Sequence, residues 1–149
     1  MQENSYKQYT ANFNASDIPS LYADWDWLIN PKYLDEPWVM SQFGDLFFEG
    51  PDGGVFFLDT LEGTITPFAK DQASAEERLT DEATLARYLS SDAVVVLRNR
   101  GLLLKEDELY IYVPHPIVTG AVVLDSVQAM SMKVVVSLGA QLLRQVRPV

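Results

Sequence analysis

The chain has 149 residues, 48% hydrophobic and 21% charged, a globular composition that excludes a largely disordered protein. Its net charge is −10, and residues 1–70 alone carry eleven acids and three bases, so no nucleic-acid partner is expected, because phosphate binding needs a cationic footprint. The chain lacks cysteine, an apolar amino-terminal run and any apolar segment near the ~20 residues that span a bilayer, which predicts a cytoplasmic protein without membrane contact.

The first 15 residues mix polar and aromatic side chains, and we expect a loosely held lead-in over residues 1–15 before a single domain over residues 16–149. A helix is predicted over residues 17–29, because Asp17 can cap its start and Pro19 suits its first turn. Apolar side chains recur there at helical spacing. The expected buried stripe consists of Leu21, Trp25 and Leu28.

Two strands rich in aromatic and β-branched residues are predicted next, over residues 46–49 and 55–59. Between them, Gly50-Pro-Asp-Gly-Gly54 supplies a tight turn with positive φ, which glycine reaches at low cost. A second turn at residues 61–63 leads into a third strand over residues 64–68. The pattern predicts a three-stranded antiparallel meander.

The two Phe pairs of this hairpin indicate that both faces of the sheet are used. Side chains alternate across a strand, so one of Phe47 and Phe48 faces away from the main core, and the same holds for Phe56 and Phe57. Some of these aromatics are therefore expected to lie under a helix on the second face or to line an interface.

Helices are predicted through the middle of the chain. Ser74 and Glu77 have the spacing of a capping box, and the helical region that they open extends to residue 88 or 89, with a possible break near residues 80–81. A further helix is predicted over residues 93–100, ended by Gly101 in a left-handed conformation. The valine-rich start of that helix is alternatively a buried strand.

The last third alternates strand and turn signals before a closing helix. Residues 109–113 are predicted as a strand, followed by the extended or turning segment Pro114-His115-Pro116. Residues 122–124 and 127–130 are candidate strands, and apolar spacing predicts an amphipathic helix over residues 132–146. The fold class expected from the whole chain is α+β, with an antiparallel meander sheet packed against helices.

No arrangement of residues indicates catalysis, a metal or a cofactor. His115 is the only histidine and has no companion at ligand spacing, and Asp52-Gly-Gly54 lacks the alternating oxygen ligands of a calcium loop. A carboxylate pair does acid–base work only when its two pKa values are pushed apart, and the paired carboxylates here sit among polar residues. These pairs are Asp24/Asp26, Asp35/Glu36 and Glu106/Asp107/Glu108.

Several motifs, spread over about residues 25–146, resemble the carboxy-terminal domain family of type VI secretion immunity proteins, formerly a domain of unknown function often found after a GAD-like domain. Where that family tends to show a double glycine, this chain has Gly120-Ala121, and a GAD-like portion is short or absent. The matching motifs are Trp25-x-Trp-Leu-Ile29, Phe43-Gly-Asp-Leu-Phe47, Asp52-Gly-Gly-Val55, Leu58-Asp-Thr-Leu-Glu-Gly63, Leu109-x-x-x-Val-Pro114 and Leu138-Gly-Ala-Gln141.

The resemblance implies an α+β domain that binds and neutralises a toxin, in the best-known case a DNase, without being an enzyme. The acidic first half agrees, because it complements a cationic partner. The alternative is a general protein- or ligand-binding regulatory module; a small hydrolase would need a deep pocket with a shifted carboxylate beside His115. The residues expected to bind the toxin are Asp24, Asp26, Asp35, Glu36, Glu49, Asp52 and Glu62.

Overall fold

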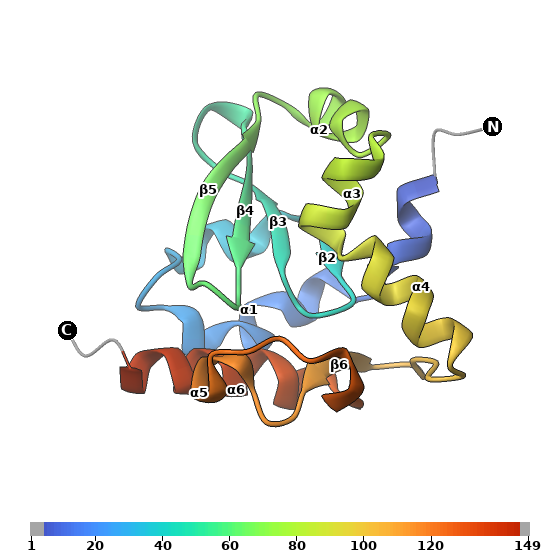
Figure 1. Ribbon diagram of the computed structural model, residues 1–149. Helices are drawn as coiled ribbons and strands as arrows, with labels where there is room; N and C mark the ends of the chain where they lie inside the picture. The colour runs from blue at the N-terminus through green and yellow to red at the C-terminus, as the bar shows by residue number, and fades with distance from the viewer. Residues whose placement is uncertain (1–4, 147–149) are drawn as a thin grey trace.

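The computed structural model describes residues 5–146, and it has the α+β architecture that the sequence predicts (Figure 1). A five-stranded antiparallel sheet has the order β1-β2-β3-β4-β5, and a separate two-stranded sheet pairs β6 with β7. The strands are β1 (Thr10–Ala11), β2 (Pro37–Ser41), β3 (Leu46–Glu49), β4 (Val55–Asp59), β5 (Thr64–Ala69), β6 (Glu108–Tyr112) and β7 (Val127–Ser131).

The helices are short apart from the last one. The α-helices are α1 (Ile18–Leu21), α2 (Gln72–Arg78), α3 (Glu82–Leu89), α4 (Ser91–Asn99), α5 (Pro116–Thr119) and α6 (Met132–Val146). The 3₁₀ turns are η1 (Ser5–Tyr9), η2 (Ala15–Asp17), η3 (Ala23–Trp25), η4 (Pro31–Asp35), η5 (Pro51–Gly53) and η6 (Leu124–Ser126). No helix in the described range is long and apolar enough to cross a membrane.

The predicted meander is confirmed as the strands β3, β4 and β5, and the chain adds two strands to its edge that the sequence did not reveal. Asp52 and Gly53 adopt φ values of +60° and +75° in the turn between β3 and β4. On the other side of β3, β2 pairs with β1, where Thr10 lies opposite Ser41. Tyr6 is only 2% exposed. Tyr6 and the strand β1 therefore connect the expected lead-in to the fold, whereas Lys7, Asn12 and Asn14 are exposed.

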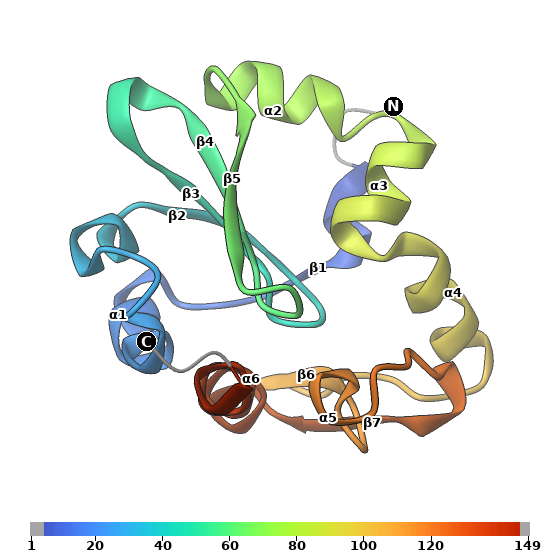
Figure 2. The same cartoon turned by 60° about the vertical axis from the view of Figure 1, so that its left-hand side comes forward.

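The predicted alternation of aromatic side chains is also confirmed. Helices α2 and α3 cover one face of the sheet, and α6 with the segment around α1 lies on the other (Figure 2). Phe47 and Phe57 are buried on the face of the sheet that α2 and α3 cover. Phe48 is buried on the opposite face with residues of α6 and of the segment around α1. The sheet is therefore the middle of three layers, and both of its faces are apolar.

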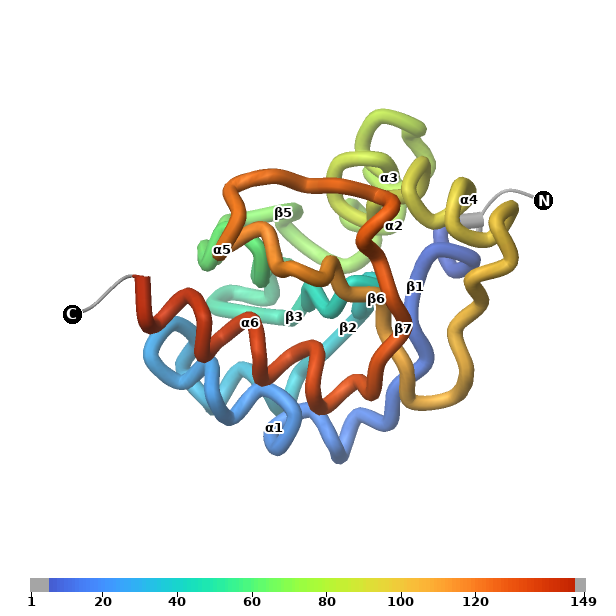
Figure 3. Tube along the Cα trace, turned by 60° about the horizontal axis from the view of Figure 1, so that its bottom comes forward, coloured from blue at the N-terminus to red at the C-terminus, as the bar shows by residue number. Residues whose placement is uncertain are grey.

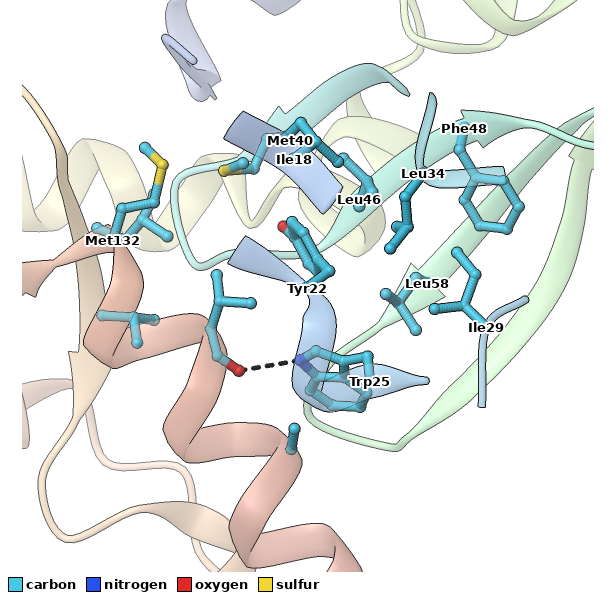
Figure 4. Packing of buried hydrophobic residues seen from close by; sticks show 14 of the residues in the cluster. Ile18, Tyr22, Trp25, Ile29, Leu34, Met40, Leu46, Phe48, Leu58 and Met132 are labelled. Atoms are coloured by element: carbon cyan, nitrogen blue, oxygen red, sulfur yellow. Dashed lines mark hydrogen bonds between the residues drawn. The ribbon is translucent and has the colours of Figure 1, made fainter. Parts of the chain in front are cut away.

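The helix predicted over residues 17–29 is wrong in extent, because α1 ends at Leu21 and a 3₁₀ turn follows. Two long-range hydrogen bonds hold this irregular segment: Tyr22 Oη donates to the Gly44 carbonyl at 2.7 Å, and Trp25 Nε1 donates to the Val136 carbonyl at 2.9 Å (Figure 4). Side-chain hydrogen bonds to distant parts of the chain thus hold this segment in place of a continued helix. Of the predicted stripe, Trp25 is buried, whereas Leu21 and Leu28 are only partly buried. The other buried residues of this segment are Ile18 and the two neighbours of the predicted stripe, Tyr22 and Ile29.

The helical middle of the chain is confirmed, but the predicted capping box is wrong. Asp71 caps α2, its side chain accepting the backbone N–H of Ser74, which therefore lies inside the helix. The break near residues 80–81 is present, and Asp81 caps α3 in the same way. The valine-rich segment is helical in α4, so its alternative as a strand is wrong, and Gly101 ends the helix region with a φ of +85°.

In the last third, β6, β7 and α6 match their predicted positions, whereas residues 122–124 form no strand. Helix α6 lies alongside α1 and carries the core-facing residues of the third layer (Figure 3). Its buried face differs from the apolar stripe that the spacing predicts, because only Val135 of that stripe is buried and Val146 is 57% exposed. The predicted stripe consists of Val135, Leu138, Leu142 and Val146. The buried residues of α6 are Met132, Val135, Val136, Gly139, Ala140 and Leu143.

Candidate functional site

All seven carboxylates that the sequence nominated for partner binding are exposed, but they fall into three groups and not one surface. The largest group lies where β2 begins and β3 ends. There the backbone N–H of Glu49 donates to the Glu36 carbonyl at 2.9 Å, which places the two residues side by side. Asp35 precedes Glu36, and Asp52 lies in the turn that follows Glu49. We call these four residues the acidic end.

The acidic end stands on packed aromatic rings. Tyr33 contacts Phe48 with ring centroids 6.0 Å apart, and Phe48 stacks on Phe56 at 6.0 Å with an interplanar angle of 22°. The nearby cation Lys32 lies over the Tyr33 ring at 5.1 Å. Because the backbone here is held by sheet pairing and ring packing, the carboxylates are displayed on a rigid support, which lowers the entropy cost of binding a partner.

The remaining predicted acids lie elsewhere. Asp24 and Asp26 flank the end of η3, where Asp24 accepts a hydrogen bond from Ser137 Oγ of α6. Glu62 is in the turn between β4 and β5, at the opposite end of β4 from Asp52. The structure therefore brings together four of the seven predicted residues and separates the other three from them.

A cavity of about 200 Å³ lies where the turns after β2 and β4 meet the layer formed by β6 and α6. Much of its lining is apolar or aromatic and comes from Phe43, Leu61, Ile111, Val122 and Val135. Polar side chains make up much of the remaining lining. The polar side chains are those of Asp45, Thr60, Ser90, Tyr112 and His115.

Asp45 is the central polar group of this cavity. Its Oδ1 accepts hydrogen bonds from the backbone N–H and the hydroxyl of Thr60, both at 2.8 Å, and its Oδ2 accepts from Ser41 Oγ at 3.0 Å. Burial raises the pKa of the Asp45 carboxyl to about 6, with a second contribution from the negative charge of Asp59, and the three hydrogen bonds oppose this rise. The carboxyl is therefore still mostly ionised at neutral pH.

His115 lies in the same cavity but is held as an acceptor. It caps α5, and its Nδ1 accepts the backbone N–H of Ile117 at 3.2 Å. Burial lowers the pKa of His115, so the ring is neutral at pH 7 and carries its proton on Nε2. Within the described residues, no hydrogen bond joins His115 to Asp45 or Ser90, and Nε2–H cannot accept a proton from a serine. A serine–histidine–aspartate mechanism therefore has no support in this geometry.

A larger hollow of about 1010 Å³ lies between residues 10–17 and residues 103–108. Its lining mixes Arg98 and Lys105 with Asp17 and Glu106. The Arg98 guanidinium donates to the Gln8 carbonyl and is thereby engaged within the fold. Charges of both signs line this hollow, so its electrostatics select no particular class of ligand.

The sequence analysis did not nominate Asp45 and Thr60 as site residues, although both lie in the matching motifs. The strand register of the meander could have indicated Asp45. Because β3 and β4 are antiparallel with Leu46 opposite Leu58, the residues just outside this pair, Asp45 and Asp59, come to the same end of the sheet. Two acids at one end of a hairpin indicate a carboxylate whose pKa is raised by the neighbouring negative charge.

Among the described residues, no group of three or more His, Cys, Asp or Glu side chains could hold a metal ion. Comparison with known proteins adds no family: no protein-family model matches the chain, and no curated protein matches it closely enough to count as a relative.

Proposed function

We propose that this protein is a non-enzymatic, cytoplasmic immunity-type protein that binds a cationic protein toxin and neutralises it through its acidic surface. The observation that carries the proposal is the exposure of all seven nominated carboxylates. Six of them, all but Glu62, form no ion pair with the residues that the structure describes. Their charge is therefore available to a partner.

Two further observations support this proposal. The motif resemblance to immunity proteins and the charge of the first half are independent of each other, and both favour a binding protein. The acidic end concentrates four carboxylates on a packed aromatic support, with Lys32 close by. A nuclease that acts on nucleic acid needs a cationic groove, and a negative surface of this kind can occupy such a groove.

The test begins with affinity capture from a lysate of the native organism, followed by mass spectrometry. A captured protein supports the proposal only if its expression alone stops growth and co-expression of this chain restores growth. The binding-deficient variant is the triple reversal Asp35→Lys, Glu36→Lys and Glu49→Lys. Exposed substitutions usually change stability by less than about 0.5 kcal/mol each, so we expect the variant to fold.

The matched control is the triple reversal Glu77→Lys, Glu82→Lys and Glu106→Lys, which makes the same change in net charge at exposed positions elsewhere. We expect the first variant to lose protection and the control to keep it. The wild-type complex should also weaken as salt is raised, because the screening length is only about 8 Å at physiological ionic strength. Equal protection by both variants would contradict the proposed role of the acidic end.

A further inference from the structure

The cavity around Asp45 contains a negative charge that no described residue neutralises. Within residues 5–146, no lysine or arginine lines the cavity, and the one ion pair joins Arg100 to Asp125, away from Asp45. His115 supplies no positive charge, because burial keeps it neutral at pH 7. Buried charges in proteins are usually paired. An unpaired carboxylate at the wall of a cavity therefore favours a cationic guest.

The carboxylate also has room for one more hydrogen bond. An ionised carboxylate offers about four acceptor sites, and Asp45 uses three of them on Thr60 and Ser41. These bonds fix the orientation of the group and leave it able to accept from a donor in the cavity. An ammonium group provides such a donor together with the missing charge.

The rest of the lining suits a cation on an apolar stem. Phe43 stacks on Tyr112 with ring centroids 5.4 Å apart and an interplanar angle of 18°, and both rings line the cavity. Aromatic faces attract cations, and the aliphatic side chains around them suit a hydrocarbon chain. The volume of about 200 Å³ corresponds to roughly six water molecules at about 30 Å³ each, which limits the guest to a few heavy atoms.

Other guests fit less well. An anion would meet the Asp45 carboxylate in a lining without a lysine or arginine, and the described residues offer no set of ligands for a metal ion. We propose that this cavity binds a primary ammonium group on a short apolar stem, with Asp45 accepting its hydrogen bond and Tyr112 beneath its charge. This site is separate from the acidic end and does not rest on the proposed function.

Isothermal titration with butylammonium and with 1-butanol at pH 8 tests the proposal, because the two probes have the same stem and differ in charge. We expect butylammonium to bind at least tenfold more tightly, and Asp45→Asn to abolish this difference. Equal binding of the two probes, or an unchanged preference in Asp45→Asn, would overturn the proposal. Denaturant unfolding of the variant verifies that it is folded.

A second arm uses wild-type protein and so avoids any folding defect. Lowering the pH from 8 to 5 protonates Asp45 and should weaken butylammonium binding about tenfold, given its pKa of about 6. His115 gains charge over the same range, so the measurement is repeated with His115→Asn, which retains a capping acceptor. The other ionisable groups around the cavity are Asp59, Asp92, Tyr22, Tyr110 and Tyr112. Binding that does not change with pH in His115→Asn would contradict the role of Asp45.

The ammonium group could belong to a free amine or to a lysine side chain of another protein. N-acetyl-lysine-N-methylamide carries the lysine side chain between blocked peptide groups and separates these sources. If it binds as tightly as butylammonium, the site accepts a lysine side chain. If only butylammonium binds, the site takes a free amine. Binding of neither ligand would refute the proposal.

Discussion

Replacing Asp45 by asparagine should change how the stability of this protein depends on pH. The folded state binds the Asp45 proton more tightly than the unfolded chain does, because its pKa rises from 3.8 to about 6 on folding. The stabilisation from protonation is thus fully present below pH 3.8 and is lost as the pH rises through 6. At about 1.4 kcal/mol per pKa unit, the ionised carboxyl costs the fold about 3 kcal/mol at pH 7.

Asparagine carries no charge and avoids this cost. Its side-chain oxygen can still accept both hydrogen bonds from Thr60, whereas Ser41 Oγ loses its acceptor at the other atom. Loss of that bond costs about 1 kcal/mol at every pH. We therefore expect Asp45→Asn to be about 2 kcal/mol more stable than wild type at pH 7, and slightly less stable at pH 4.

The measurement is urea unfolding of both proteins at unit intervals between pH 4 and pH 8. Groups that titrate equally in the two proteins cancel in the difference between their free energies of unfolding. The control Asp26→Asn makes the same change in net charge at an exposed position, so it separates the effect of burial from that of net charge. A constant difference for Asp45→Asn would refute the reasoning that burial perturbs this group.

Two further predictions concern the backbone and the core. Gly53→Ala should lower the free energy of unfolding by about 1–2 kcal/mol, because Gly53 has a φ of +75°. Gly54→Ala should be nearly neutral, because Gly54 has a φ of −70°. Equal melting temperatures for the two variants would contradict this account of the turn. Trp25→Phe should lower the free energy of unfolding by about 1–3 kcal/mol, because it removes the buried donor to the Val136 carbonyl. An unchanged midpoint in denaturant unfolding would mean that this hydrogen bond does not anchor α6.

Local patterns in the sequence were sufficient to predict the meander strands β3, β4 and β5 and the bounds of the closing helix. The glycine-rich turn and its flanking aromatics predicted β3 and β4 residue by residue, because positive φ and alternating burial depend on neighbours in the chain. The bounds of the closing helix were also predicted correctly, although the tertiary structure decided which of its apolar residues are buried. The exposure of the seven acids also followed from their type and their positions in turns and at strand ends.

Only the tertiary structure decided which of these residues meet. The segment after Pro19 is irregular because Tyr22 and Trp25 bond to backbone atoms at Gly44 and Val136, and no local pattern reports partners so distant in sequence. The same limit applies to the cavity. The pKa of Asp45 is raised because two turns, β6 and α6 surround its carboxyl and remove part of its hydration. Desolvation depends on what surrounds a group in space, which its neighbours in the chain do not determine.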